Sequence, residues 1–218
     1  MYIGLTGTIA SGKSTIATLF ERCGAHTIDL DILSKRLIER GTPAYHAIID
    51  TFGTEILKEG NIDRRKLRDI VFNSSEKKKT LESILHPLIR EEEEKIVNHI
   101  ISKYKNPIII VHAALLIETF SYKRFDLLIV IYADEAACLS RLIERDKISK
   151  ELALLMLQSQ LKTEKKIAYA NFIIDNTRDI DYLKIEVERV YNMLLLLEKT
   201  KNILKKHNKI GATYYKST

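Results

Sequence analysis

The sequence predicts an α/β fold whose centre is a doubly wound parallel sheet of five strands. Short runs of β-branched and other apolar residues recur along the chain, as they do in strands that are buried on both faces. Segments with helical spacing fill the gaps between these runs, and this alternation favours parallel strands joined by right-handed crossovers. A glycine-rich loop follows the first run, at the strand end where such a sheet builds its site.

The predicted strands and helices follow one another in a simple order. The strands are expected at residues 2–5, 26–29, 108–111, 127–132 and 172–175. A helix with one apolar face begins near Lys13, and Gly24 ends it. The final helix has apolar residues at a spacing of 3.6 over residues 183–197, so we expect it to pack on the core.

The most specific motif lies directly after the first strand. Gly7, Thr8, Ile9, Ala10, Ser11, Gly12, Lys13 and Ser14 satisfy G-x-x-x-x-G-K-[ST], and Thr15 follows them. In this motif, here called the P-loop, backbone amides and a helix N-terminus hold the phosphates of a nucleoside triphosphate. Lys13 is expected to reach the β- and γ-phosphate oxygens, and the Ser14 hydroxyl to ligate Mg²⁺.

Two stretches exceed the length of a single crossover helix. Residues 32–105 carry several helical patterns, including 67–72 and 81–101, and we expect a helical acceptor-substrate domain there. Residues 135–166 predict one long charged helix or a pair, which we interpret as a movable lid. The nucleotide-binding core then comprises residues 1–31, 106–134 and 167–198, and a basic tail spans 199–218.

The charge distribution disfavours nucleic acid as a partner. The net charge is +6, yet residues 199–218 hold the excess lysines and no acid, so residues 1–198 are neutral. The tail lysines are Lys199, Lys201, Lys205, Lys206, Lys209 and Lys216. The uncharged runs are too short to span a bilayer, no signal peptide opens the chain, and Cys23 and Cys138 form no metal or disulfide pattern. We therefore expect a soluble cytoplasmic protein with neither nucleic-acid nor membrane partners and a solubilising or frayed tail.

Two acids follow the second predicted strand. Positions i and i+2 of an extended chain share a face, so Asp29 and Asp31 could both look toward the strand ends. One could take a proton from an alcohol while the other orders metal-bound water. Alternatively, either could cap the next helix. GTPases and motor ATPases are disfavoured, because N-K-x-D is absent and the strand at 108–111 runs into His112 rather than an acid.

Arg141 and Arg145 form an i,i+4 pair on one predicted helix face. Planar guanidinium groups match the charge that phosphoryl transfer spreads over the equatorial oxygens. A mobile helix with this pair could close over a triphosphate and exclude water. The alternative is a ladder of surface ion pairs with Glu144, Asp146 and Glu151.

Short motifs occur in a fixed order at residues 3–7, the P-loop, 28–31, 52–53, 63–64, 86–89, 115–118, 141–142 and 174–176. Over about residues 1–180, this ordered set resembles the dephospho-CoA kinase family. The resemblance implies a P-loop kinase-like core with a helical substrate domain and a lid. It also implies transfer of the γ-phosphoryl group of ATP to the ribose 3′-hydroxyl of dephospho-CoA, the last step of coenzyme A synthesis.

The resemblance also implies roles for individual positions. It gives Asp31 as the base and Arg141 as the lid arginine, and Lys13 completes the expected catalytic set. ATP contacts are expected from residues 7–15, Arg145 and Asn176. Acceptor contacts are expected from Asp31, Arg64, His86, Pro87 and Ile89. A solvated helix start is the alternative for Arg64, and a helix-entry turn is the alternative for His86 and Pro87.

Several positions depart from the family pattern. His112 and Ala114 replace an Asp and a Pro, Lys35 replaces an Arg or His, and Asn171 replaces an Asp. We expect His112 to be a hydrogen-bonded structural residue rather than a base. The alternative functions are a kinase for another small molecule, such as a nucleoside monophosphate, or a regulatory ATPase that binds nucleic acid through the tail.

Overall fold

The structure is a computed structural model that describes the backbone of residues 1–214 and the side chains of residues 1–203. The chain divides into two compact units. The first comprises Met1–Thr27 and the segment from Tyr104 to the C-terminus, and the second comprises Ile28–Lys103. Among the described residues, none of the helices is both long and apolar enough to cross a membrane.

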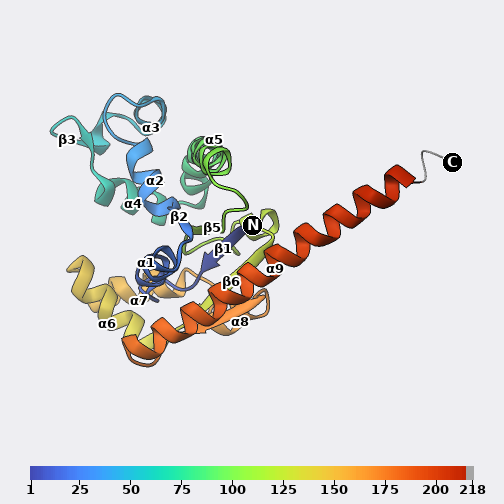
Figure 1. Cartoon of the computed structure of the whole chain (residues 1–218). Helices are drawn as coiled ribbons and strands as arrows, with labels where there is room; N and C mark the ends of the chain where they lie inside the picture. The colour runs from blue at the N-terminus through green and yellow to red at the C-terminus, as the bar shows by residue number, and fades with distance from the viewer. Residues whose placement is uncertain (215–218) are drawn as a thin grey trace. The chain divides into compact units, whose positions relative to one another are not determined.

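A five-stranded sheet forms the centre of the fold, as predicted (Figure 1). Its strands are β1 (Tyr2–Thr6), β2 (His26–Asp29), β5 (Ile109–His112), β6 (Leu127–Tyr132) and β7 (Phe172–Asp175). The spatial order is β2-β5-β1-β6-β7, and β1 runs parallel to both of its neighbours. The central strand is apolar because both of its faces are covered, and Ile3 and Leu5 are fully buried.

Two helices of the first unit share a core with the sheet. Helices α1 (Lys13–Cys23) and α9 (Ile180–Tyr214) pack against each other. Their apolar stripes meet side chains from β1 and β6 in one buried cluster that includes Phe20, Val187 and Val190. The final helix does not end near residue 198 as predicted. It continues to Tyr214 (red in Figure 1), while the side chains of the tail lysines after residue 203 lie outside the described part of the chain.

The predicted lid segment consists of three helices rather than one or two. They are α6 (Glu135–Asp146), α7 (Lys150–Gln158) and the short α8 (Thr163–Ile167). Side-chain caps determine where α6 and α7 begin. Asp134 accepts a hydrogen bond from the Ala137 amide, and Ser149 accepts one from the Leu152 amide. Alanine, leucine and cysteine side chains of α6 and α7 pack together with P-loop residues Ile9 and Ala10.

The second unit is mainly helical, as predicted. It contains α2 (Leu30–Leu37), α3 (Pro43–Phe52), α4 (Arg64–Phe72) and α5 (Ser75–Lys103). It also contains a two-stranded hairpin, β3 (Leu57–Lys58) with β4 (Asn61–Ile62), which the sequence interpretation missed. The unit has its own apolar cluster, formed by Tyr45, Ile48, Phe52, Ile56, Ile62 and Leu67.

The alternative given for His86 and Pro87, a helix-entry turn, is wrong. Both residues lie inside α5, within the helical pattern expected over 81–101, and the helix continues through the proline. Proline disfavours a helix interior, since it lacks an amide and its ring crowds the preceding turn. The 29-residue helix nevertheless contains Pro87 in its interior.

Candidate active site

The P-loop connects β1 to α1 in the conformation that the motif predicts. Gly12 has φ +94°, in the left-handed region, and α1 begins at the next residue. A side chain at Gly12 would place its Cβ 2.3 Å from Nδ2 of Asn176. A Cβ at Gly7 would lie 2.7 Å from the Ser11 hydroxyl. Tight packing therefore requires glycine at both positions, and the left-handed backbone requires it at Gly12 as well.

Lys13 folds across the loop that precedes it. Its ammonium group donates to the carbonyl oxygens of Gly7, at 3.1 Å, and Thr8, at 2.9 Å. The residue is 9% exposed, so its charge acts where screening by solvent is weak. A cation in this position, together with the N-terminus of α1, makes the loop a favourable place for phosphate.

Asn176 supports the loop from the end of β7. Its Nδ2 donates to the carbonyl oxygen of Ser11 at 2.8 Å, and its side chain is buried. The backbone amide of Asn176 donates to the carbonyl of Tyr132 in the neighbouring strand. Asn176 therefore supports the P-loop through its side-chain amide, and the predicted contact with the nucleotide stays a prediction.

Ser14 and Thr15 lie in the first turn of α1 and are exposed. Among the described residues, no group of three or more His, Cys, Asp or Glu side chains could hold a metal ion. A single serine hydroxyl beside a phosphate cradle fits Mg²⁺, which binds through few protein ligands and completes its shell with phosphate oxygens and water. The donor set therefore fits Mg²⁺ that arrives with a nucleotide.

Arg141 and Arg145 lie one turn apart on α6, as predicted, and both are exposed. Arg145 forms a bidentate ion pair with Asp146, at 2.7 and 3.0 Å. This contact confirms, for Arg145, the alternative interpretation that the two arginines form ion pairs on the surface. Arg141 is close enough to the Cys138 thiol for its charge to act on it.

Cys138 lies where the lid helices contact the P-loop, a position that no sequence pattern predicted. The thiol is buried, and its Sγ lies 4.0 Å from Oγ1 of Thr8. Burial raises the pKa of Cys138, while the hydrogen bond with Thr8 and the charges of Arg141 and Lys13 oppose that rise. The charges of Arg141 in the lid segment and Lys13 in the P-loop thus both lower the pKa of the Cys138 thiol.

Asp29 and Asp31 do not share an extended strand, so the geometric argument that paired them is wrong. Strand β2 ends at Asp29 and α2 begins at Leu30, which puts Asp31 in the first helical turn. Asp29 is the helix N-cap, because its Oδ1 accepts from the amides of Asp31, at 2.8 Å, and Ile32, at 2.9 Å. The capping alternative is therefore confirmed for Asp29, while Asp31 stays at the N-terminal end of α2.

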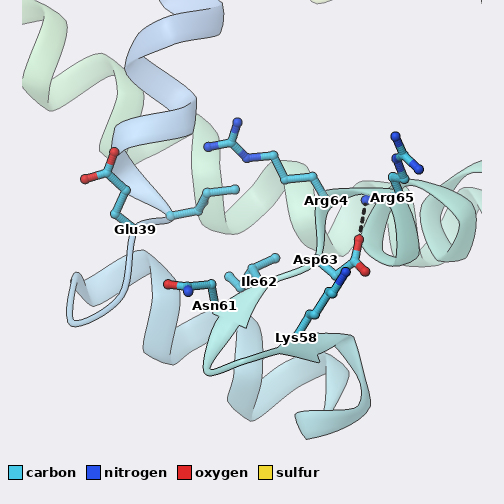
Figure 2. A pocket seen from close by; sticks show the side chains of 8 residues that line it. Glu39, Lys58, Asn61, Ile62, Asp63, Arg64 and Arg65 are labelled. Atoms are coloured by element: carbon cyan, nitrogen blue, oxygen red, sulfur yellow. Dashed lines mark hydrogen bonds between the residues drawn. The ribbon is translucent and has the colours of Figure 1, made fainter. Parts of the chain in front are cut away.

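The second unit contains a charged cavity of about 680 Å³, shown in Figure 2. It is lined by Ile38, Glu39, Lys58, Asn61, Ile62, Asp63, Arg64 and Arg65. Asp63 caps α4 by accepting from the amide of Arg65 at 2.9 Å, which confirms a helix start at Arg64. The capping bonds and the nearby lysines hold the pKa of Asp63 below its usual value, so its carboxylate is charged.

Of the residues predicted to bind the acceptor, only Arg64 lines this cavity. Arg64 lines it and donates to the Lys35 carbonyl at 3.2 Å, and Figure 2 shows its guanidinium directed away from Asp63. His86, Pro87 and Ile89 lie on α5 and are not among the lining residues. Lys58 and Arg65 line the cavity but were missed, because the hairpin that brings Lys58 there had no recognisable pattern.

His112 ends β5 and is buried, at 5% exposure. Its position in the sheet supports the expectation of a structural histidine. Asn171 has a defined contact as well, because its Oδ1 accepts from the Leu128 amide at 2.8 Å. An asparagine oxygen serves this contact as well as the oxygen of an aspartate would, so the departure from the family pattern is conservative here.

Comparison with known proteins gives one consistent family. The family model described as dephospho-CoA kinase matches residues 1–181. A dephospho-CoA kinase of Aquifex aeolicus is 41% identical over 193 residues, which are 88% of this chain and 96% of that protein. The dephospho-CoA kinase structure from Campylobacter jejuni has a TM-score of 0.64 at 31% identity, with 88% and 96% of the two chains covered. A Thermus thermophilus structure, TT1252, has a TM-score of 0.73 at 28% identity over the same shares.

Proposed function

This chain belongs to the dephospho-CoA kinase family, and from that premise we propose how its own residues carry the ATP-dependent phosphorylation of dephospho-CoA. The observation that supports the proposal best is the P-loop, with Lys13 folded over it at the N-terminus of α1. Phosphoryl transfer needs positioning and charge stabilisation more than covalent chemistry from the protein. The roles below follow that requirement.

The P-loop binds the phosphates of ATP. Backbone amides of the P-loop and the N-terminus of α1 supply fixed donors, and Lys13 supplies a buried positive charge. The Ser14 hydroxyl would hold Mg²⁺ that arrives with the nucleotide, and the bound ion would supply neutralising charge. Asn176 acts through the loop, since it holds the Ser11 carbonyl.

Arg141 stabilises the charge that moves during transfer. It is exposed on α6, and Cys138 of the same helix lies 4.0 Å from Thr8, so α6 carries Arg141 beside the P-loop. Arginine suits this task because its planar group donates to two oxygens at once. Arg145 contributes less in this state, because its guanidinium is engaged by Asp146.

The acceptor is recognised by the second unit. The cavity in Figure 2 offers Arg64, Arg65 and Lys58 to an anionic ligand, and dephospho-CoA carries a diphosphate that fits such a site. Asp31 then orients the ribose 3′-hydroxyl or accepts its proton. His86, Pro87 and Ile89 remain proposed acceptor contacts along α5. We also place the enzyme in the cytoplasm with small-molecule substrates alone, which the neutral balance of residues 1–198 supports.

Replacement of Asp31 tests the acceptor chemistry separately from ATP binding. We expect Asp31→Asn to lower kcat about 100-fold, the lower range for loss of a proton acceptor, and to leave the KM for ATP within about twofold. Helix α2 should persist, since Asp29 caps it. Coupled assays of ADP and CoA formation measure both constants. Asp50→Asn, an exposed change on α3, is the matched control. Full turnover by Asp31→Asn would remove this residue from the mechanism.

A further inference from the structure

Lys166 on α8 is fully buried, and none of the roles above explains it. Its ammonium group lies 2.9 Å from Oε1 of Glu118 and donates to the Ala114 carbonyl at 2.7 Å. Burial lowers the pKa of Lys166, and the bond with Glu118 opposes that shift. A buried charge is costly unless it is paired, so an apolar residue would be the simpler choice for stability alone.

The ion pair ties α8 and the chain before it to the end of β1. Oε1 of Glu118 also accepts from the Leu161 amide at 3.0 Å. The Ala114 carbonyl that Lys166 contacts also accepts from Oγ1 of Thr6, at 3.2 Å. Thr6 is the last residue of β1, directly before the P-loop. The pair therefore fixes the segment 160–166 beside the entrance of the loop.

The same segment contacts the P-loop itself. Oε1 of Gln160 accepts from the Ile9 backbone amide at 2.9 Å. Three residues later, Oγ1 of Thr163 lies 3.4 Å from Oγ1 of Thr8, and both residues are buried. Ile9 is followed by Ala10, whose φ of +61° is unusual for a residue with a side chain. The hydrogen bond from the Ile9 amide to Gln160 thus restrains the Thr8–Ile9 peptide, directly before the positive φ of Ala10.

We propose that Gln160 is a positioning residue for phosphoryl transfer, and that the buried pair of Lys166 and Glu118 serves to hold Gln160 against the Ile9 amide. The inference rests on the proposed role of the P-loop in binding ATP. Gln160 acts through the orientation of the Thr8–Ile9 peptide, which comes directly before the next donors of the cradle. Displacement of a phosphate by about 1 Å can cost about 100-fold in rate, so a restraint on this peptide has a measurable effect.

Gln160→Met preserves the length of the side chain and removes its strong acceptor. We expect kcat/KM for ATP to fall about tenfold, while the KM for dephospho-CoA changes less than twofold and the Tm changes by less than about 3 °C. The control is Gln158→Met, because Gln158 is exposed and, among the described residues, forms no hydrogen bond with the P-loop. A kcat/KM for ATP equal to that of the control, with or without a lower Tm, would indicate a structural role only and overturn the proposal.

A double-mutant cycle tests the link to the ion pair. If Lys166 acts through Gln160, the combined effect of Lys166→Met and Gln160→Met on kcat/KM for ATP should be clearly smaller than the product of the single effects. Independent, multiplying effects would disprove the link. Lys165→Met is the matched control, since Lys165 is the exposed neighbour. If Lys166→Met does not fold, Glu118→Gln replaces it in the cycle, because it weakens the pair and keeps an acceptor for Leu161.

Failure of the proposal for Gln160 can be told apart from failure of the proposed function. Failure of the proposed function would appear in the unmodified enzyme, as absence of CoA formation from ATP and dephospho-CoA. Failure of this inference would appear only in the variants, as kcat/KM values for ATP equal to that of the unmodified enzyme.

Discussion

The backbone of Gly12 leaves no room for a side chain at the junction of the P-loop and α1. Its φ of +94° is a conformation that other residues adopt at a cost of about 1–2 kcal/mol. A Cβ would also displace Asn176, whose Nδ2 holds the Ser11 carbonyl. One glycine therefore serves both the shape of the loop and the contact that supports it.

Gly12→Ala should accordingly lower the free energy of unfolding by about 2 kcal/mol and weaken ATP binding at least tenfold. Urea unfolding and calorimetric titration with a non-hydrolysable ATP analogue measure the two effects. Gly41→Ala provides the control, because Gly41 has φ +87° but no atom within 4 Å of the added Cβ. It should lose about 1 kcal/mol and no ATP affinity. Equal effects of both variants on binding would contradict the role given to Asn176.

Single residues also show where sequence reasoning was weakest. The P-loop was predictable residue by residue, because its function depends on a fixed spacing of backbone groups. The pairing of Asp29 with Asp31 was not, since it required the strand to continue through Leu30, where the chain instead begins a helix. The alternative that Asp29 caps this helix was the correct physical interpretation.

At the level of elements, α9 is attached to the start of β1 by charged contacts. Nζ of Lys201 lies 2.7 Å from Oδ1 of Asp126, and the other oxygen of Asp126 accepts from the Tyr2 amide at 2.9 Å. The N-terminal ammonium of Met1 lies 3.6 Å from Oε2 of Glu198 in the same helix. These contacts explain why the helix remains in contact with the first unit beyond its apolar stripe.

Burial alone would raise the pKa of Asp126, but Lys201 and the Tyr2 amide hold it below its usual value. The folded pKa lies below the unfolded value of about 4, so the stabilisation is complete above pH 4 and disappears as pH falls through the folded pKa. We expect Asp126→Asn to lose about 0.5–1 kcal/mol at pH 7, since the pair is partly exposed, and the difference to shrink as the pH falls from 4 toward 2.

Urea unfolding at both pH values checks this prediction. Asp181→Asn is the matched control, because its pair with Lys184 lies within one exposed helical turn and should contribute less than about 0.5 kcal/mol. A difference between Asp126→Asn and the unmodified protein that persists unchanged at pH 2 would show that the carboxylate charge is not its source.

Elements were predictable where a pattern is long and local. All five strands and α1 lie within a residue or two of their expected positions, because apolar runs and a C-terminal glycine identify them. The hairpin of β3 and β4 was missed, since two-residue strands have no periodicity. The three-helix form of the lid depended on the Ser149 cap and on contacts with the P-loop, which sequence spacing does not reveal.

For the whole molecule, the separate apolar clusters of the two units imply separate unfolding. Ile48 is fully buried in the cluster of the second unit, and Ile131 is fully buried in that of the first. We expect Ile48→Ala to cost about 2–4 kcal/mol and to speed hydrogen exchange across residues 43–72 while leaving β1 and β6 unchanged.

Exchange measured by mass spectrometry tests this expectation, and Ile131→Ala should give the reverse pattern. ATP binding should survive Ile48→Ala, since the P-loop belongs to the first unit. Faster exchange in both units after either change would mean that the chain unfolds as one cooperative body.

The amino-acid order by itself determined the sheet, the P-loop and the class of reaction, because each depends on groups close together in the chain or on an ordered set of motifs. Only the tertiary structure revealed the network around Gln160, Lys166 and Glu118 and the cavity beside Arg64. Their members are separated by many residues and meet only when helices pack. Such contacts depend on the distances and burial that folding creates, and local sequence carries no record of them.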